Sequence, residues 1–344
     1  MNGRERMNAV LNHEPPDRVP FVPSIYEHGA RVIGRSPYET SRSAALTAEA
    51  ALKSYEIYGH DLVTVGIDIY NVEAEAFGCE LSFDPKKYIP GIKSHPLAGS
   101  TALDAGGLDI PAPGEGNRLQ LIVDATQRVV DEAGDEVWVL ATMSGPFSQA
   151  AELRGFENLI CDMVDTPERV HELMNLTTEL SLQQARRISE VGAGVSIFES
   201  WATIPLITSD IFAEYVVPYN KKVIEMIKRD YEVPPPAVIM GGDTAMLMDH
   251  FIDVGTSLVV ADYMTDLELM KEKTRDLQMI VRGCADPKMI ERGQWEGVQE
   301  SIDGLARKKR GMNNFVWGCG CVSLDTGTDA LMRFKKMCAE AGGH

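Results

Sequence analysis

Met279-Ile-Val-Arg-Gly-Cys284 is a short, mostly apolar run that ends in a cysteine. A second run of the same kind, Phe315-Val-Trp-Gly-Cys319, follows further along the chain. Runs that are apolar throughout, rather than alternating with polar residues, are typical of parallel strands covered on both faces. The two runs therefore predict the last two strands of a β–α repeat, each delivering a thiol at its carboxyl end.

The same pattern recurs along the whole chain, with helical stretches between the apolar runs. Eight such runs predict strands at residues 19–24, 62–67, 137–142, 195–199, 237–241, 257–262, 279–282 and 315–317. Eight β–α units predict an α/β fold of the (β/α)8 TIM-barrel type, in one domain over residues 1–344. A doubly wound open sheet is the alternative, but no Gly-rich phosphate-binding motif follows the first strand.

The intervening helices carry recognisable start signals. Thr166 is a plausible N-cap, and Pro167 occupies the first helical position, where its missing N–H costs nothing. A helix that begins at Ser209 should be kinked or divided by Pro218. Residues 79–117 are too long for a simple loop and predict an elaboration over the barrel mouth.

Composition limits the class of protein. The 344 residues are 44% hydrophobic, which supplies ample material for a core. A net charge of −18 argues against nucleic acid and anionic membranes as partners. The six cysteines are scattered, no apolar run reaches the roughly 18–20 residues of a membrane helix, and the first residues do not resemble a signal peptide. We therefore expect a cytoplasmic location.

In a barrel of this kind the reactive groups lie at the carboxyl ends of the strands. Carboxylates, thiols and large side chains gather at these predicted ends. They are Asp68, Tyr70, Met143, Glu199, Trp201, Asp243, Asp262, Tyr263, Cys284, Asp286, Trp317, Cys319 and Cys321.

Cys284 and Cys319 are the candidate metal ligands, because zinc is often held by two thiolates and one or two harder ligands with one position open. Asp243 and Glu199 are the carboxylates expected to complete such a site, and Cys321 could substitute for a thiolate. The alternative is that the cysteines are simply small buried hydrophobic residues.

The other candidates also have structural alternatives. Asp262 and Asp286 could cap the helices that follow them, as Asp often does just after a strand. Trp201, Tyr263 and Trp317 could line a substrate pocket or only pack against neighbours.

Several segments, taken in order, resemble the uroporphyrinogen decarboxylase superfamily. They are Arg4-Glu-Arg-Met-Asn-Ala-Val-Leu11, Pro16-Asp-Arg-Val-Pro20, Gly145-Pro-Phe-Ser-Gln-Ala150, Glu199-Ser-Trp-Ala202, Val217-Pro-Tyr219, Gly241-Gly-Asp-Thr244 and Gly283-Cys-Ala-Asp-Pro287. The resemblance spans nearly the whole chain and implies a (β/α)8 barrel. Decarboxylases of this family carry an Arg-rich segment after the first strand, whereas residues 24–31 lack it, and Asp68 lies one residue away from the position of the decarboxylases' key aspartate. A tetracarboxylate substrate is therefore not expected.

The corrinoid-dependent methyltransferase branch resembles this chain better, through Val72-Glu-Ala-Glu-Ala-Phe-Gly78 and Gly145-Pro-Phe147. Members that methylate coenzyme M hold zinc with a His-x-Cys pair after the fifth strand and a cysteine after the eighth. Cys319 matches the last ligand, but Ile239 and Gly241 occupy the positions of the pair. Transfer of a methyl group from a methylcorrinoid to a thiol is therefore kept as an alternative function.

The resemblance leads to a specific hypothesis. A zinc-dependent enzyme would transfer a methyl group from a small methylated donor, an O-methyl ether, to the Co(I) corrinoid of a corrinoid protein. Zinc would stabilise the leaving oxygen, and Asp243, Glu199 or Asp68 would supply a proton. Tyr70, Met143, Trp201, Tyr263 and Trp317 would bind the donor. A decarboxylase of the same fold is the second alternative function. The sequence leaves the oligomeric state open, and a homodimer is one possible assembly.

Overall fold

The computed structural model describes residues 1–83, 89–99, 103–112, 114 and 117–342. Its strands are β1 (Leu62–Val65), β2 (Glu80–Ser82), β3 (Gly91–Ser94), β4 (Trp138–Ser144), β5 (Gly194–Phe198), β6 (Ala237–Ile239), β7 (Leu258–Ala261), β8 (Ile280–Ala285) and β9 (Phe315–Cys319). In the described residues β1, β4, β5 and β6 form one parallel sheet, β7, β8 and β9 form another, and β2 and β3 form an antiparallel hairpin.

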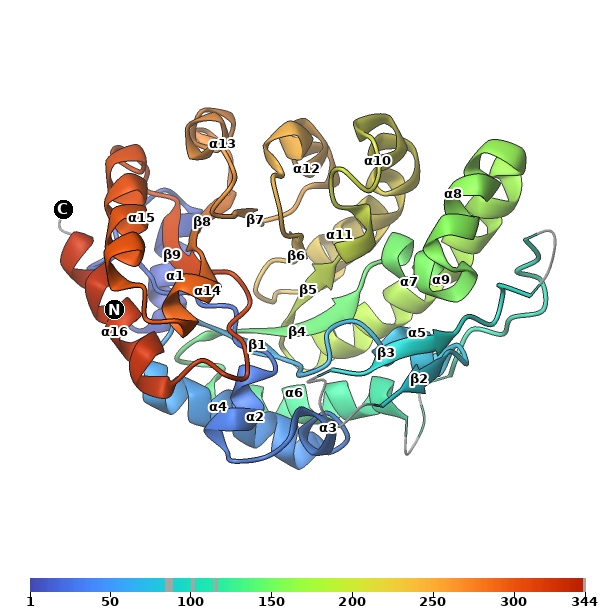
Figure 1. The fold of residues 1–344 in the computed structure, drawn as a ribbon, viewed down its shortest axis with the longest axis horizontal. Coiled ribbons are helices and arrows are strands. Elements are labelled where there is room, and N and C mark those ends of the chain that lie inside the picture. The colour runs from blue at the N-terminus through green and yellow to red at the C-terminus, as the bar shows by residue number, and fades with distance from the viewer. Residues whose placement is uncertain (84–88, 100–102, 113, 115–116, 343–344) are drawn as a thin grey trace.

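The helices lie outside the strands (Figure 1). In chain order they are α1 (Gly3–Leu11), α2 (His28–Val32), α3 (Pro37–Thr40), α4 (Ala44–Tyr58), α5 (Val72–Ala76), α6 (Arg118–Ala133), α7 (Pro146–Arg154), α8 (Phe156–Asp165), α9 (Pro167–Glu190), α10 (Ser209–Tyr215), α11 (Val217–Asp230), α12 (Met248–Val254), α13 (Leu267–Thr274), α14 (Pro287–Glu291), α15 (Trp295–Lys308) and α16 (Thr328–Ala341), with 3-10 turns at η1 (Ser200–Ala202) and η2 (Ala245–Leu247).

The two parallel sheets join into the predicted (β/α)8 barrel. On one side, the N–H of Ser257, just before β7, donates to the carbonyl of Pro236, just before β6, over 3.1 Å. On the other side, residues 20–24 connect β9 to β1. Val22 donates to the carbonyl of Trp317 over 2.7 Å, and Asp61 donates to the carbonyl of Phe21 over 2.9 Å.

Residues 19–24 occupy the place of the first predicted strand without forming a regular one. They make only isolated parallel bridges, from Phe21 to Trp317 and from Ser24 to Cys321. Pro20 and Pro23 have no N–H to donate, so a continuous ladder of hydrogen bonds cannot form on both sides.

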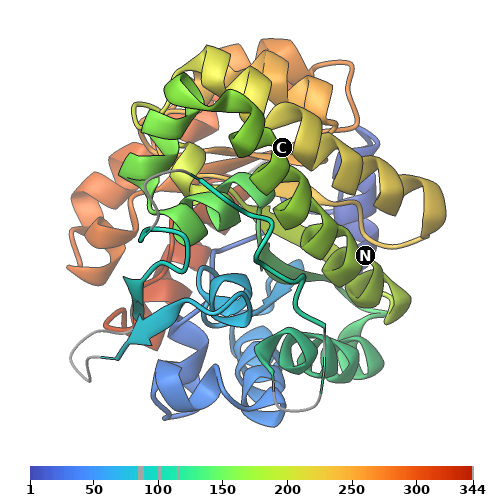
Figure 2. The same ribbon diagram turned by 90° about the vertical axis from the view of Figure 1, so that its right-hand side faces the viewer.

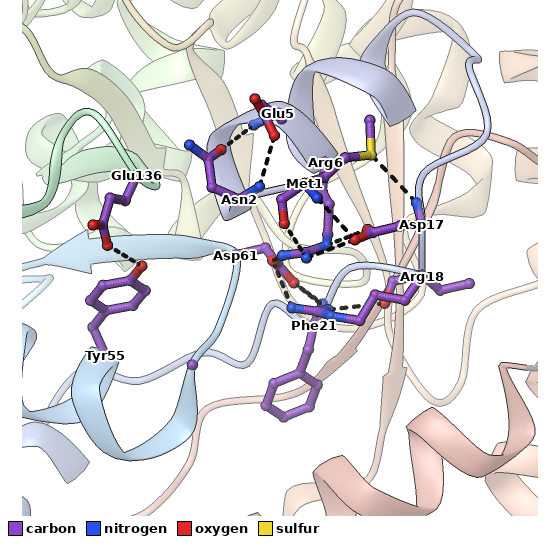
Figure 3. A network of polar contacts seen from close by, with 12 residues as sticks. Met1, Asn2, Glu5, Arg6, Asp17, Arg18, Phe21, Tyr55, Asp61 and Glu136 are labelled. Carbon is purple, nitrogen blue, oxygen red and sulfur yellow. Dashed lines mark hydrogen bonds and ion pairs between the residues drawn. The ribbon is translucent and has the colours of Figure 1, made fainter.

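A polar network fixes this irregular segment to the start of β1 (Figure 3). The buried carboxylate of Asp61 accepts hydrogen bonds from Arg6 over 3.1 Å, from Arg18 over 2.7 and 2.9 Å, and from the N–H of Phe21 over 2.8 Å. Asp17 pairs with Arg6 over 2.6 Å, and this pairing lowers the pKa of Asp17. Charge pairing therefore replaces part of the missing strand ladder.

The predicted helix boundaries are largely confirmed. Pro167 lies in the first turn of α9, with Thr166 at the N-cap position, although the Thr166 side chain makes no capping hydrogen bond. Pro218 divides the helix predicted to begin at Ser209 into α10 and α11. Asp286 caps α14 by accepting a hydrogen bond from the N–H of Lys288 over 2.8 Å. This confirms capping, the alternative role predicted for Asp286 from the sequence.

The elaboration contains the β2–β3 hairpin on the side that faces the viewer in Figure 2. After the hairpin, the N–H of Leu97 donates to the carbonyl of Leu153 over 3.0 Å, so the segment packs against the end of α7. Residues 84–88, 100–102, 113 and 115–116 of the predicted elaboration lie outside the described residues.

Candidate active site at the barrel mouth

A cavity of about 280 Å³ lies at the carboxyl ends of the barrel strands. Apolar walls come from strand residues such as Phe198, Ile239 and Val260. Its polar lining comes from Ser24, Tyr26, Tyr70, Ser200, Thr203, Asp262, Arg282 and Cys321. A cavity with apolar walls and a few convergent polar groups at this end of a barrel is the expected position of an active site.

Two larger hollows lie away from the mouth. One of about 790 Å³ is at the amino ends of the strands, where Val10, Val19 and Phe315 line it. Another of about 1060 Å³ is an open groove between α4 and α6. Neither lies at the carboxyl ends of the strands, so the smaller cavity at the mouth is the better candidate.

The structure does not bring the two predicted thiolate ligands together. Cys284 pairs with Gly318 across the β8–β9 ladder, whereas Cys319 pairs with Ala285. Since neighbouring residues of a strand face opposite sides, Cys284 points into the barrel and Cys319 points toward the surrounding helices. Both side chains are buried, and burial raises the pKa of Cys284 to about 12.

A zinc site of the predicted composition therefore does not fit these residues. Among the residues that the structure describes, no three His, Cys, Asp or Glu side chains are arranged to hold a metal ion. Cys321 is the thiol that lines the cavity, and this residue is exposed. One thiol and the Asp262 carboxylate, beside the positively charged Arg282, are a poor donor set for a divalent cation.

Glu199 belongs to the fold and does not line the cavity. It is fully buried, and its two carboxylate oxygens accept from the N–H of Phe147 and Ser148 over 3.3 and 2.9 Å, from the Ser148 hydroxyl over 2.8 Å and from Asn220 over 2.6 Å. Burial raises the pKa of Glu199, while these hydrogen bonds oppose the shift. With four donors already bound, the carboxylate holds the start of α7 against α11.

Asp68 is also bound in a structural network. Its Oδ2 pairs with Arg118 over 2.6 Å, and its Oδ1 accepts from the Asn71 amide over 2.8 Å and from two backbone N–H groups. Both Asp68 and Arg118 are buried. Neither carboxylate oxygen of Asp68 is exposed, so the structure does not support its predicted catalytic role.

Asp243 remains exposed at the mouth. It lies in the loop after β6, two residues beyond Gly241, which lines the cavity, and its Oδ1 accepts from the N–H of Ala245 over 3.1 Å. Asp262 lines the cavity directly. Its oxygens accept from the N–H of Gly242 over 3.0 Å and from the N–H of Tyr263 over 2.9 Å, so it stabilises both neighbouring loops.

The predicted substrate-binding side chains divide into three groups. Tyr70 lines the cavity. Trp201, stacked on Phe156 with ring centroids 5.1 Å apart, and Tyr263, 52% exposed, lie in the loops around the mouth. Met143 and Trp317 are buried in the core cluster between strands and helices, because they fall on the outward face of β4 and β9. Their assignment to a substrate pocket is therefore corrected.

Arg282 and Tyr26 are cavity residues that were not predicted from the sequence. Arg282 lies in the middle of β8 and is only 6% exposed, and Tyr26 follows the irregular first segment. Arg282 did carry a signal, since a charged residue inside an apolar strand must be paired or serve a function. Burial raises the pKa of Tyr26 to about 12 and that of Tyr70 further, so both hydroxyls stay protonated.

Glu73 and Glu152 form a second group of buried acids beyond the mouth. Burial raises the pKa of Glu73 to about 7 and raises that of Glu152 well above its usual range. Charge repulsion from Glu73 adds to the shift of Glu152, and repulsion from Asp68 adds to that of Glu73. Among the described residues, Oε2 of Glu152 has no hydrogen-bond partner. These acids are candidates for pH-dependent stability.

Comparison with known proteins places this geometry in context. Residues 2–341 match the family model described as uroporphyrinogen decarboxylase (URO-D). The chain is 26% identical over 335 residues to methylcobamide:CoM methyltransferase MtbA of Methanosarcina mazei, covering 93% of each. It is 25% identical over 283 residues to a uroporphyrinogen decarboxylase of Chlorobium chlorochromatii, covering 79% of this chain and 76% of that one.

A solved structure described as a methyltransferase from Methanosarcina mazei has the same fold. It superposes with a TM-score of 0.82 and covers 98% of each chain at 20% sequence identity. Among the helices that the structure describes, none is both long and apolar enough to cross a membrane.

Proposed function

Because the chain belongs to the uroporphyrinogen decarboxylase (URO-D) family, we propose that it is a corrinoid-dependent methyltransferase. It takes a methyl group from a small methylated donor, an O-methyl ether, and transfers it to the Co(I) corrinoid of a partner protein. The observation that carries this proposal is the small cavity at the mouth of a barrel that is similar over 93% of its length to a methylcobamide methyltransferase.

The size and lining of the cavity favour a small donor. Its volume of about 280 Å³ lies just below the roughly 300–1,000 Å³ of small-molecule sites. A tetrapyrrole with several carboxylates would need more room and several cations. Arg282 is the guanidinium in this lining, and residues 24–31 lack the decarboxylases' Arg-rich segment. These features disfavour the decarboxylase alternative.

Tyr26 and Tyr70 supply the chemistry that a poor leaving group needs. When the methyl carbon leaves an ether, the electron pair of the C–O bond stays on oxygen. Both residues line the cavity and their hydroxyls stay protonated, so we expect them to donate hydrogen bonds to that oxygen as its charge develops. Asp243, exposed in the loop beside the cavity, would deliver the proton from solvent. Zinc has no part in this proposal, because Cys284 and Cys319 face opposite sides of the sheet.

The rim of the cavity supplies a docking surface for the corrinoid protein. Large apolar side chains are exposed in the loops that follow β5, β6 and β7, at Trp201, Leu206, Met246, Tyr263 and Met264. Exposed apolar side chains gathered in this way mark interaction surfaces. This rim is continuous with the cavity through Asp262, and methyl transfer requires the corrinoid to reach the donor within bonding distance. We therefore assign the corrinoid protein to this surface.

Transfer from a methylcorrinoid to a thiol is the second candidate, favoured by the names of two methyltransferases to which this chain is similar. The positions of the His-x-Cys pair, Ile239 and Gly241, do line the cavity, but neither side chain can bind a metal or activate a thiol. We therefore place this direction second.

An anaerobic assay separates the candidates. The protein is mixed with a Co(I) corrinoid protein and methoxylated, N-methylated or thiol substrates, and the cobalt spectrum is followed. We expect methyl–Co(III) to form with a methoxylated donor, and Tyr70→Phe to slow it. Demethylation of methyl–Co(III) only by thiols would establish the second candidate, and carbon dioxide release from uroporphyrinogen would establish the decarboxylase.

A further inference from the structure

Arg282 is a buried cation without a counter-ion. Its side chain is 6% exposed and lines the mouth cavity. Within the described part of the chain, its Nε has no hydrogen-bond partner and no carboxylate pairs with its guanidinium. The guanidinium cannot lose its proton in a protein. A buried charge that is left unpaired is costly and rare, so its presence in a cavity points to a ligand.

The groups around Arg282 do not neutralise it. Tyr26, Cys284 and Cys321 lie near the guanidinium. Burial raises the pKa of Tyr26 and of Cys284 to about 12, and the pKa of the thiol of Cys321, an exposed residue, is also raised. They are therefore uncharged at neutral pH and can contribute only weak hydrogen bonding. Asp262 lines the same cavity, but its oxygens accept from the backbone of the loops after β6 and β7.

The barrel makes room for this side chain. A Cβ at Gly318, on the facing strand β9, would lie 2.7 Å from Cγ of Arg282 and 2.8 Å from its Cδ. A residue with a side chain at position 318 would therefore displace the arginine. The absence of a side chain at Gly318 therefore leaves the space that the Arg282 side chain occupies inside the barrel.

Strand register gives the depth of this position. Arg282 pairs with Val260 in the β7–β8 ladder, two residues before Asp262. Two residues of a strand correspond to roughly 6–7 Å. Arg282 therefore lies deeper in the barrel than Asp262, and a ligand bound to it would extend from the floor of the cavity toward the rim.

We propose that Arg282 binds an oxyanion, a carboxylate or a sulfonate, of the small molecule that occupies the cavity. The substrate is then an acidic compound held by its anionic end at the floor, with the reacting group toward the rim where the corrinoid protein docks. This inference rests on the proposed function for its methyl chemistry, but anion binding itself does not depend on that function.

Direct binding tests the proposal without corrinoid or catalysis. Calorimetric titrations use acetate and methanesulfonate as minimal anions, 4-methoxybenzoate as a carboxylate donor, 2-mercaptoethanesulfonate as a sulfonate thiol, and uncharged 4-methoxybenzamide. We expect Arg282→Gln to weaken oxyanion binding about 10- to 100-fold, with Arg282→Lys in between and the amide unaffected. Tighter binding of 4-methoxybenzoate would identify the methyl donor as the molecule that carries the anion. Tighter binding of 2-mercaptoethanesulfonate would instead identify the methyl acceptor.

The proposal is overturned if no oxyanion of this panel binds the wild type more tightly than Arg282→Gln, or if the amide binds as well as the benzoate. Methyl transfer from uncharged donors only would also overturn it while leaving the proposed function intact. Conversely, Arg282-dependent anion binding without any methyl transfer would refute the function and not the anion site.

Stability separates a binding role from a structural one. Since the charge is unpaired, Arg282→Gln should unfold at the same denaturant concentration as the wild type or at a higher one. The matched control is Arg154→Gln, because Arg154 is equally buried but pairs with Asp162 over 2.6 Å. We expect the control to unfold at a lower concentration. Equal destabilisation by both variants would mean that Arg282 supports the fold.

Discussion

Glu199 accepts hydrogen bonds from two backbone N–H groups of α7, from the Ser148 hydroxyl and from the Asn220 amide. A glutamine at this position can accept at only one of its two terminal atoms, so at least one buried donor loses its partner. Glu199→Gln should therefore reduce the free energy of unfolding by about 1–3 kcal/mol, measured by chemical denaturation.

The matched control is Glu190→Gln, at an exposed position at the end of α9, which should change stability by less than about 0.5 kcal/mol. Equal stability of the wild type and Glu199→Gln would contradict the structural role of Glu199 and restore it as a candidate catalytic acid.

Glu73 makes stability depend on pH. Burial raises its pKa from 4.5 in the unfolded chain to about 7 in the fold. Below pH 4.5 the carboxyl is protonated in both states. Between pH 4.5 and 7 it ionises only in the unfolded chain, so stability falls as pH rises through this window, by about 3 kcal/mol in all.

Denaturation of wild type and Glu73→Gln at pH 5, 6, 7 and 8 measures this contribution. The variant should lack the part of the decline that Glu73 causes, whereas Glu49→Gln, at an exposed position of α4, should behave as wild type. Parallel pH profiles for Glu73→Gln and wild type would contradict the assignment.

At the scale of elements, the segment 19–24 depends on Asp61 because its prolines prevent a full strand ladder. Asp61→Ala leaves Arg6, Arg18 and the N–H of Phe21 without their shared acceptor. We expect a loss of about 3 kcal/mol in the free energy of unfolding. Asp17→Ala, at a side chain 44% exposed, should cost less than about 1 kcal/mol. Similar losses for both variants would contradict the anchoring role of Asp61.

The order and type of β1 and of β4 to β9 were predictable from the sequence because buried parallel strands leave continuous apolar runs, whereas residues 19–24 form no regular strand and the β2–β3 hairpin was not predicted. Which residues of each strand face the barrel interior could not be predicted from the sequence. Cys284 and Cys319 both end their strands, but the register places Cys284 opposite Gly318, so the two thiols diverge. A shift of one residue would have reversed this result, and nothing local in either run specifies the register.

Carboxylates could be located but not assigned a role from the sequence. Asp68 and Glu199 do follow strands, yet their partners Arg118, Ser148 and Asn220 come from distant parts of the chain. Only the assembled fold shows that these oxygens are already bound. Arg282 was missed for the opposite reason, since its importance lies in the partners that the fold fails to supply.

In the whole molecule, the barrel mouth combines a cavity with an exposed apolar rim that is continuous with it, and the rim predicts a docking site. Met246 and Met264 are 71% and 67% exposed in the loops after β6 and β7. Met246→Glu combined with Met264→Glu should raise KM for the corrinoid protein about tenfold or more, while kcat with free cob(I)alamin stays unchanged.

Met332→Glu is the control for this pair, because Met332 is 39% exposed on α16, away from the rim. It should leave KM for the corrinoid protein unchanged. If the rim variant lost activity equally with free cob(I)alamin and with the corrinoid protein, the rim would serve the cavity and not the docking of a partner.

Methyl transfer from a methoxylated acid to Co(I) is tested most directly by the absorption spectrum of the reduced corrinoid protein, recorded anaerobically after this enzyme and the acid are added. We expect the Co(I) band to disappear as the methyl–Co(III) spectrum grows, with one demethylated product formed for each cobalt. The proposed direction of transfer is wrong if the Co(I) spectrum stays unchanged with all methylated donors and the enzyme instead demethylates methyl–Co(III) in the presence of a thiol.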